Sequence, residues 1–361
     1  MKKSTIFEGY LNIARNQQSV LWTIPFDNRR DSINFPEKLI SKYQLVSGAR
    51  VKCEINNNKR VTNVLAICGH KPEDFESRSN FSKLIPVNPF EKYDFGSSDS
   101  TSVRILDLIT PIGKGTRGLI VSPPRAGKTV LLEAIANDLH RLDPKLKVIV
   151  LLIDERPEEV TSFIRNTKAD VFHSSLDQGS ASHILLSSYL VDHVRVEVEC
   201  GNDIVILIDS LTRMGRAYNL NDNRHSNRIM SGGLSSGALE LPRKLFGMAR
   251  NIENGGSCTI LATILKDTGS RMDEVIFQEF KGTGNSEIIL DRDIAEQRIF
   301  PAINITESGT RKEELLHSSV ELDKINDIRR QLLQIDKSAA ISKLRTIIDR
   351  YETNTELLKK Y

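Results

Sequence analysis

The sequence predicts an α/β protein with a mainly parallel sheet, preceded by a small β-barrel and followed by a helical C-terminal segment. Three observations lead to this fold class. Short β segments separated by turns fill residues 1–70, apolar runs alternate with helical stretches from Val103 onward, and the pattern after Arg311 is helical to the end. Fully apolar strands that alternate with helices are typical of a parallel sheet covered on both faces.

The first 70 residues are expected to form a basic β domain. Turn-rich pieces separate four or five short strands, a pattern that favours a small barrel or sandwich. The region holds eleven Lys or Arg against five Asp or Glu, whereas the whole chain has a net charge of only +3. A basic small domain suits a polyanion such as nucleic acid, although a solvated surface without a partner explains the charge equally well. The expected strands are Thr5–Ile13, Ser19–Ile24, Ala49–Ile55 and Arg60–Ile67.

The rest of the chain divides into three parts. Residues 71–102 are polar, carry three prolines and are interpreted as a linker. The α/β domain is expected over residues 103–317 and the helical segment over residues 318–361. The expected strands of the α/β domain are Gly118–Val121, Val148–Ile153, Ile204–Ile208, Thr259–Leu265 and Glu287–Leu290, and the expected late helices are Glu313–Leu316, Asp323–Leu333 and Ile341–Tyr351.

Composition excludes several classes of protein. No apolar run approaches the length of a membrane span, so no membrane partner is expected. The N-terminus carries no visible export signal. The four cysteines are widely scattered and give neither a metal-binding spacing nor a disulfide framework. We therefore expect reduced thiols and a cytoplasmic location.

The most informative stretch is Ser122–Thr129, which reads SPPRAGKT and joins an apolar run to an expected helix. Such a strand, loop and helix can hold a nucleoside triphosphate, because backbone N–H groups and the positive end of the helix face the phosphates. Lys128 is expected to neutralise phosphate oxygens, and the Thr129 hydroxyl is expected to bind Mg²⁺. The alternative is a chance Gly-Lys-Thr at a helix start, and the flanking strand and helix argue against it.

Two further strand ends carry carboxylates. The run 148–153 leads to Glu155, which is placed to orient or deprotonate an attacking water, and to Arg156, which can hold phosphate oxygens or position that glutamate. The run 204–208 ends in Asp209, as in a Walker B strand whose carboxylate serves Mg²⁺. The alternative for the first run is a charged strand end that faces solvent, and the signal of the second run is weak alone because many buried strands end in Asp. The preceding P-loop favours the chemistry in both cases.

Three loops are candidates for contact with other molecules. The segments 222–233 and 281–285 combine glycine with Lys or Arg, which suits a phosphate backbone, although ordinary surface loops have the same composition. Arg311 lies on a loop far downstream of the P-loop. In assembled ATPases such an arginine can reach the γ-phosphate held by a neighbour, whereas a solvated arginine before a helix is the alternative.

Taken together, these runs resemble the bacterial Rho transcription termination factors over essentially all of residues 103–317. The resemblance implies a RecA-like P-loop NTPase core behind an OB-like RNA-binding barrel. It also implies a homohexameric, ATP-driven RNA translocase and helicase that uses ATP and Mg²⁺, binds single-stranded RNA and acts on an RNA polymerase elongation complex. The matching strings are PIGKGTRGLIV (111–121), PPRAGKT (123–129), LIDERPEEVT (152–161), DSLTRMGRAYN (209–219), FKGTGN (280–285), RIFPAI (298–303) and SGTRKEELL (308–316).

The same resemblance implies roles for individual residues. Glu155, Lys128, Arg311 and Arg156 are implied to be catalytic, with Arg311 donated across a subunit interface. Thr129 and Asp209 are implied to serve the metal. Nucleotide contacts are implied for Gly113, Lys114, Gly115, Thr116, Arg117, Gly118, Arg125, Ala126, Gly127, Lys128, Thr129, Val130, Arg156, Arg213 and Phe300, the last of which stacks on the adenine. RNA contacts are implied for Arg228 and for Lys281, Gly282, Thr283 and Gly284 in two central-channel loops, and for Trp22, Phe35, Lys59 and Arg60 on the barrel.

The sequence departs from the family pattern at several positions. Ser122 and Arg125 stand where the family has Ala and Lys in the P-loop. Trp22 is the only aromatic in the stretch that matches the base-stacking strand of the barrel. Because stacking contributes about 1–3 kcal/mol per base, primary RNA binding is expected to be weakened, altered or lost. The alternatives are a related hexameric ATPase of the flagellar, type III export or rotary synthase kind, which RNA would not stimulate, and an RNA-binding module with a vestigial motor.

Overall fold

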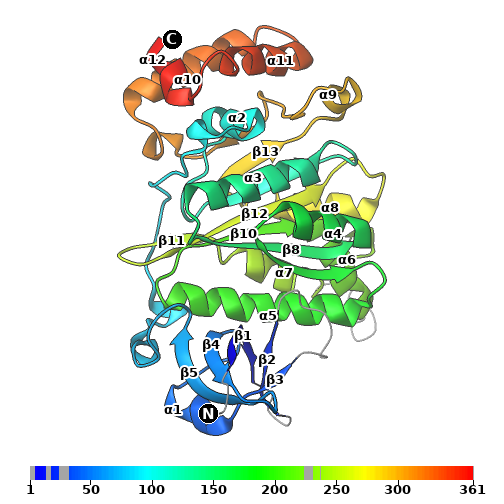
Figure 1. Ribbon diagram of the computed structural model, residues 1–361. Helices are drawn as coiled ribbons and strands as arrows, with labels where there is room; N and C mark the ends of the chain where they lie inside the picture. Colours follow the sequence, from blue (N-terminus) through cyan, green and yellow to red (C-terminus); the bar gives the residue numbers. More distant parts are fainter. Residues whose placement is uncertain (1–4, 14–17, 24–31, 223–230, 236, 361) are drawn as a thin grey trace.

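The computed structural model describes residues 5–13, 18–23, 32–222, 231–235 and 237–360. Figure 1 shows the barrel against one side of the long helix α5 (Ser180–Glu199), the large sheet on the other side of that helix, and the C-terminal helices at the far end. This order of elements confirms the expected α/β fold with a barrel before it and a helical segment after it.

The N-terminal barrel is built from β1 (Thr5–Asn12), β2 (Val20–Trp22), β3 (Ile33–Asn34), α1 (Glu37–Lys42), β4 (Arg50–Ile55) and β5 (Val61–Ile67). Within the described residues the strands form an antiparallel sheet in the order β3-β2-β1-β4-β5. The N–H of Asn34 donates to the carbonyl of Lys59 over 3.1 Å, and Asn34 also bridges Arg60. These contacts bring β3 against the start of β5, so the sheet curls into a half-open barrel around Leu11 and Leu21. The four expected strands are confirmed, whereas β3 is too short to leave a sequence pattern.

The main sheet contains β6 (Pro86–Val87), β7 (Arg117–Ser122), β8 (Lys147–Glu155), β9 (Asp170–Ser175), β10 (Ile204–Asp209), β11 (Arg250–Ile252), β12 (Ser257–Leu265), β13 (Ser286–Ile289) and β14 (Gly309–Thr310). In the described part of the chain its order is β14-β13-β7-β12-β10-β8-β9, with β11 beside β12 and β6 beside β11. The strands from β13 to β9 in this order are parallel. The five expected strands are confirmed. The β9 strand was not expected, because Asp170 and His173 interrupt its apolar run.

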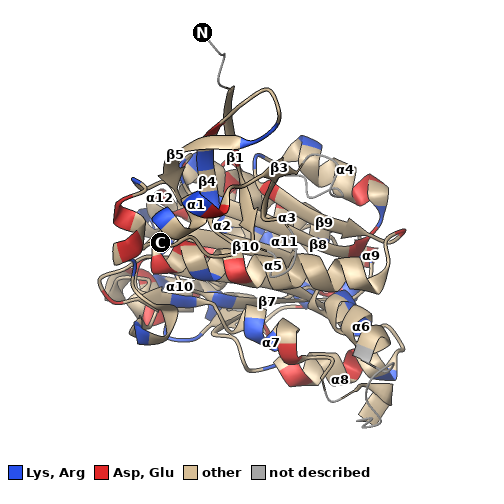
Figure 2. Ribbon diagram, turned by 90° about the horizontal axis from the view of Figure 1, so that it is seen from below, with Lys and Arg blue, Asp and Glu red and all other residues tan. Residues whose placement is uncertain are grey.

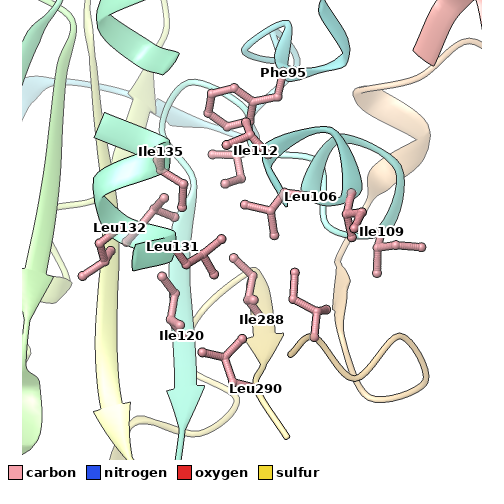
Figure 3. Packing of buried hydrophobic residues seen from close by; sticks show 14 of the residues in the cluster. Phe95, Leu106, Ile109, Ile112, Ile120, Leu131, Leu132, Ile135, Ile288 and Leu290 are labelled. Atoms are coloured by element: carbon pink, nitrogen blue, oxygen red, sulfur yellow. The ribbon is translucent and has the colours of Figure 1, made fainter. Parts of the chain in front are cut away.

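Helices cover both faces of the sheet, as its fully apolar strands require. One face carries α2 (Thr101–Ile109), α3 (Lys128–Leu142), α4 (Pro157–Asn166) and α9 (Arg292–Glu296), and the other carries α5, α6 (Leu211–Asp222), α7 (Glu240–Phe246) and α8 (Arg271–Phe280). Figure 3 shows Leu131 and Leu132 of α3 packing with Ile120 of β7 and Ile288 of β13, with Leu106 of α2 beside them. No helix in the described part of the chain combines the length and the apolarity needed to cross a bilayer.

The C-terminal helices share the core of the main domain. They are α10 (Ser319–Leu332), α11 (Lys337–Ile348) and α12 (Asn354–Lys360), and they confirm the expected helical segment. Ile325, Ile328 and Leu344 lie in the same apolar cluster as α2. Arg104 of α2 donates from Nε to Asn354 Oδ1 over 3.2 Å. The segment is therefore packed on the main domain.

Residues 71–102, which were interpreted as a linker, lie on the main domain along much of their length. They contain the short helices η1 (Asp74–Ser77), η2 (Phe81–Lys83) and η3 (Phe95–Ser97) and the strand β6, which pairs with β11. Phe75 and Phe95 are buried, and Arg78 forms an ion pair with Glu199 of α5 at 3.4 Å. A polar composition with isolated aromatic anchors thus gives a packed connection, because Phe75 packs in the apolar cluster of the barrel and Phe95 in that of the main domain.

The barrel is docked on α5 through a buried polar network. Glu197 of α5 is fully buried, and its carboxylate accepts hydrogen bonds from Arg50 Nε of the barrel at 3.0 Å and from Asn202 Nδ2 at 2.6 Å. Tyr10 of β1 lies edge-on against His193 of α5, with ring centroids 4.7 Å apart. Figure 2 shows Lys and Arg on β4 and α1 of the barrel. Arg50 carries part of that positive charge, which is neutralised by Glu197 at the interface and by Glu8 within the barrel.

Candidate nucleotide-binding site

The predicted P-loop joins the end of β7 to the start of α3. Gly127 precedes the helix with φ of 89°, a left-handed conformation that favours glycine, and Arg125 has φ of 67°. No side chain caps the first N–H groups of α3. A helix N-terminus without a cap attracts an anion, because its N–H groups and the helix dipole both favour negative charge. The loop therefore has the local structure that the phosphates of a nucleotide need.

Lys128 reaches across the sheet edge to two carboxylates. Its Nζ lies 2.5 Å from Asp209 Oδ2 at the end of β10 and 3.3 Å from Glu155 Oε1 at the end of β8. Asp209 also accepts a hydrogen bond from Thr263 Oγ1 over 2.7 Å. Burial alone would lower the pKa of Lys128, but Asp209 and Glu155 outweigh it and raise the pKa. The lysine is thus held in its charged form at the mouth of the P-loop.

Glu155 is aimed into the site by an irregularity in its strand. The register between β8 and β9 shifts at Asp154, which has φ of 58°. Arg213 of α6 donates from Nη1 to the carbonyl of Asp154, and its Nη2 lies 3.2 Å from Glu155 Oε2. That ion pair is not aligned as a hydrogen bond, and Oε2 has no hydrogen-bond partner among the described residues. A buried carboxylate oxygen without a donor is suited to hold a water.

The acidity of Glu155 also suits proton transfer. Its side chain is 1 % exposed, and burial together with the nearby charge of Asp209 raises the pKa of Glu155 to about 7. Lys128 and Arg213 oppose this rise but do not cancel it. A general base works best when its pKa lies near the working pH. Glu155 therefore fits the predicted role toward an attacking water.

A nucleotide with Mg²⁺ fits these residues. Thr129 lies in the first turn of α3, and Asp209 at the end of β10 contacts Lys128, so two oxygen donors lie at the P-loop. Among the described residues no three His, Cys, Asp or Glu side chains gather as a metal cage. Mg²⁺ is bound in such sites by one or two protein oxygens together with phosphate oxygens and water. The donor set therefore matches a metal that is held jointly with the nucleotide.

Other predicted nucleotide contacts lie near this loop. The ring of Phe300 packs beside Gly127, since a Cβ added to that glycine would lie 3.2 Å from the ring. Phe300 keeps 40 % of its surface exposed, which leaves area for a base. Arg156 is exposed at the start of α4, next to Glu155. Val130 is exposed in the first turn of α3, whereas Ala126 is buried under the loop.

The segment Gly113–Gly118 lies at the opposite edge of the sheet. It enters β7, whose six residues run to the P-loop. At about 3.3 Å per residue, the two ends of that strand are about 20 Å apart. Lys114 pairs there with Glu91 at 2.6 Å and with Asp203 at 3.1 Å. The segment therefore cannot share a pocket with Lys128 within one chain, which corrects the simplest interpretation of the predicted contacts.

Arg311 lies at the same distant edge, in a cluster of arginines. Its N–H donates to the carbonyl of Asn285 over 2.7 Å, and its Nη2 donates to the carbonyl of Gly282 over 3.2 Å. Burial and the charges of Arg250 and Arg311 lower the pKa of Arg117, whose Nε has no hydrogen-bond partner among the described residues. A cavity of about 500 Å³ is lined by Arg117, Arg311 and the 282–285 loop. These cations are suited to bind an anion. The P-loop of the same chain lies at the other end of β7, too far away to hold that anion.

Only part of the two predicted RNA loops lies within the described residues. Lys281 follows the last turn of that helix, and the Lys281–Gly284 loop lies beside Arg311. Arg228 lies outside the described residues. The next described residues, Ser231–Gly233, contact the first turn of α8, where Gly232 approaches Arg271. The ten-residue helix is about 15 Å long, so Ser231–Gly233 and Lys281 lie about that far apart.

Sequence reasoning missed the loop 266–271, which the structure brings next to residues 231–233. Its first residue, Lys266, donates its N–H to the carbonyl of Ser122 over 3.1 Å, directly before the P-loop. Thr268 Oγ1 donates to Asp273 Oδ2 over 2.6 Å, and Arg216 Nε of α6 donates to Asp273 Oδ1 over 2.8 Å. The signal in the sequence was a loop that directly follows the apolar run 259–265, begins with Lys266, contains a glycine and ends with Arg271.

The predicted RNA residues of the barrel divide into two pairs. Phe35 is 2 % exposed and belongs to the barrel core, so its ring offers no face to a base and the predicted contact is corrected. Trp22 packs against Tyr189 of α5 with centroids 4.7 Å apart, which uses one of its faces for docking. Lys59 and Arg60 are exposed at the turn between β4 and β5, where phosphate contact is sterically open.

Comparison with known proteins gives two groups of relatives. The sequence profile of the ATP synthase alpha/beta family, nucleotide-binding domain, matches residues 102–310. A protein of Akkermansia muciniphila named transcription termination factor Rho is 46 % identical over 92 % of this chain and 72 % of that protein. Proteins of the same name are 45 % identical in Streptobacillus moniliformis, over 89 % of this chain and 78 % of that protein, and 47 % identical in Pseudomonas aeruginosa, over 79 % and 69 %. A solved ATPase from the type III secretion system of pathogenic bacteria shares the fold, with a TM-score of 0.63, 21 % identity and coverage of 77 % of this chain and 86 % of that one.

Proposed function

The chain belongs to the family of transcription termination factor Rho, and from this membership and the site geometry we propose that it is an RNA-dependent ATP hydrolase. We further propose that it assembles as a homohexameric ring, moves single-stranded RNA through the ring and ends transcription at an RNA polymerase elongation complex. The observation that carries the proposal is Lys128, held between Glu155 and Asp209 beside the uncapped start of α3.

The proposed reaction is hydrolysis of ATP to ADP and phosphate. The N–H groups of the P-loop and of the first turn of α3 bind the phosphates, and Lys128 leaves the two carboxylates to neutralise phosphate oxygens. Glu155 orients the attacking water and accepts its proton at Oε2. Phe300 holds the base. Magnesium, when it is bound through Thr129 and Asp209, supplies further neutralisation of the phosphate charge.

A second chain completes the site in this proposal. Arg311 lies about 20 Å from the P-loop of its own chain, and Arg117 beside it has an unpartnered Nε. In a head-to-tail ring, the arginine edge of one subunit faces the P-loop edge of the next. Arg311 then stabilises the charge that develops on the transferred phosphoryl group, and the contact assigned to Gly113–Gly118 is made across the same interface.

RNA is proposed to act on hydrolysis through α6. Arg213 and Arg216 lie on this helix; the first contacts Glu155, and the second holds Asp273. Asp273 in turn accepts from Thr268 in the loop 266–271. RNA that binds this loop can therefore change the position of Glu155 through one rigid helix. Contact of RNA with Lys281 and Arg228 stays a prediction, as does contact with Lys59 and Arg60.

The test is steady-state ATP hydrolysis with and without single-stranded polynucleotides of different base. We expect turnover to rise when RNA is added, and a preference for one kind of base would indicate that the barrel still reads bases. Stimulation by a protein partner and not by RNA would instead favour an export ATPase. That alternative is not favoured. The secretion ATPase is only 21 % identical to this chain, whereas the three Rho factors are 45–47 % identical to it. Absence of ATP binding with magnesium would overturn the proposal.

A further inference from the structure

Two of the four cysteines come from different domains and meet at the docking interface. Cys68 directly follows β5 of the barrel, and Cys200 directly follows α5 of the main domain. Both are free thiols, and Cys200 packs against the apolar cluster that contains Cys68. A hydrogen bond with Cys200 is the largest cause of the raised pKa of Cys68. Cys68 is 1 % exposed, whereas Cys200 is partly exposed. The chain thus places a pair of thiols in contact across its main internal boundary.

Backbone contacts hold both residues in place. The N–H of Cys68 donates to the carbonyl of Arg50 over 2.7 Å, and the carbonyl of Cys68 accepts from Asn202 Nδ2 over 2.9 Å. The N–H of Cys200 donates to the carbonyl of Val196 over 3.0 Å, and Val196 packs in the same apolar cluster as Cys68. The thiol contact therefore follows from the way the barrel docks on α5.

Each thiol borders a different solvent cavity. Cys200 lines a cavity of about 330 Å³ together with His70 and Arg78, and Cys68 lines one of about 670 Å³ on the other side. The remaining cysteines differ from this pair. Cys53 lies in the barrel core and Cys258 in the main sheet, and burial raises the pKa of each thiol to about 12. Small oxidants can therefore reach Cys200 more readily than Cys53 or Cys258.

We propose that Cys68 and Cys200 form an oxidation site, at which a hydroperoxide oxidises Cys200 and Cys68 then closes a disulfide that ties the barrel to α5. In the first step the Cys200 sulfur attacks the peroxide, the O–O bond breaks, and a sulfenic acid and an alcohol or water are formed. In the second step the Cys68 sulfur attacks the sulfenic sulfur, and the hydroxyl group leaves as water with the proton of Cys68. The two thiols lose two electrons in total, and the peroxide gains them.

The second step is expected to be slow at neutral pH. The hydrogen bond to Cys200 and burial raise the pKa of Cys68 well above its ordinary value, which keeps its sulfur protonated. Cross-linking is therefore expected to speed up as the pH rises. The closed bond would hold the barrel on the main domain beyond the strength of the noncovalent network around Glu197. This inference does not depend on the proposed ATP hydrolysis.

The test treats the folded full-length chain with hydrogen peroxide and blocks the remaining thiols with N-ethylmaleimide. Trypsin then places each of the four cysteines in its own peptide, because Lys or Arg separates them along the chain. Mass spectrometry is expected to find the Cys68 and Cys200 peptides joined, with the loss of two hydrogens, and dithiothreitol is expected to release them. Sulfinic acid at Cys200 without the joined peptides, or random joining among all four cysteines, would overturn the proposal.

Two variants sharpen this test. Cys68→Ser is expected to remove the joined peptide and leave Cys200 as a sulfenic or sulfinic acid. Cys53→Ser is the matched control, because it changes another buried barrel thiol and is expected to leave the joined peptide in place. The result on the unaltered chain decides the proposal even if either variant fails to fold.

Discussion

The two edges of the main sheet differ in how their charges are balanced. At the P-loop edge, Lys128 forms ion pairs with Glu155 and Asp209, so the charges of these side chains are paired with one another. At the other edge, Arg117 and Arg311 lie together around a cavity, and Arg117 Nε has no partner among the described residues. One edge is self-neutralised and the other lacks an anion among the described residues. This difference supports the proposal that a neighbouring chain joins the two half-sites.

The largest effect is expected at the P-loop edge. Lys128→Ala should reduce ATP turnover to background, because it removes the cation held between Glu155 and Asp209 at the start of α3, while RNA binding by the barrel is retained. Steady-state turnover and a filter-binding assay with single-stranded RNA measure the two properties. Lys145→Ala, which changes an exposed lysine just after α3, is the control. Turnover equal to that of the unaltered chain would remove Lys128 from its role.

The next effect is expected at the opposite edge. Arg311→Ala should lower turnover about 10³–10⁵-fold, the usual contribution of an arginine finger. Because the residue acts on a neighbour's nucleotide, mixed assemblies should lose more activity than the fraction of altered chains. Arg330→Ala, on the exposed side of α10, is the control. A strictly proportional loss would place the effect of Arg311 within its own chain and contradict the comparison of edges.

Glu155 provides a pH test of the self-neutralised edge. Its pKa is raised to about 7, so its base form is lost as the pH falls through that value. We expect kcat/KM for ATP to fall as the pH drops from 8 to 6, and Glu155→Gln to lower turnover about 10²–10⁴-fold and to abolish this pH dependence. Glu158→Gln, in the exposed first turn of α4, should leave the profile unchanged. Persistence of the profile in Glu155→Gln would assign the titration to another group.

The smallest effect is expected away from both edges. Arg271→Ala should leave basal turnover intact and reduce the stimulation by RNA about tenfold, because it removes a phosphate contact at the loop that Asp273 and Arg216 support. Lys281→Ala tests the loop beside Arg311 in the same assay, and Arg292→Ala is an exposed control. If Lys281→Ala abolished stimulation and Arg271→Ala did not, the RNA contact would belong to the arginine edge.

Much of the fold could be predicted from the sequence, because its central strands are unbroken apolar runs that end in chemistry-bearing residues. Lys128, Glu155 and Asp209 were found in this way, and the structure brings them together. The location of Arg311 and Gly113–Gly118 relative to the P-loop could not be predicted, because it depends on which end of β7 each segment reaches. Phe35 was misjudged for a related reason: an aromatic residue next to a barrel strand has the same pattern whether it faces a base or the core. The contact of Trp22 with RNA stays a prediction.

The lysine between two carboxylates has one more consequence. When Lys128 turns to the phosphates of an incoming nucleotide, Glu155 still has Arg213 beside it. For Asp209, the hydrogen bond from the Thr263 hydroxyl is then the contact that remains among those with described residues. A buried carboxylate left facing a polyphosphate is strongly unfavourable. We therefore expect the nucleotide to bind together with a divalent cation, and a triphosphate without that cation to bind weakly next to the same carboxylates.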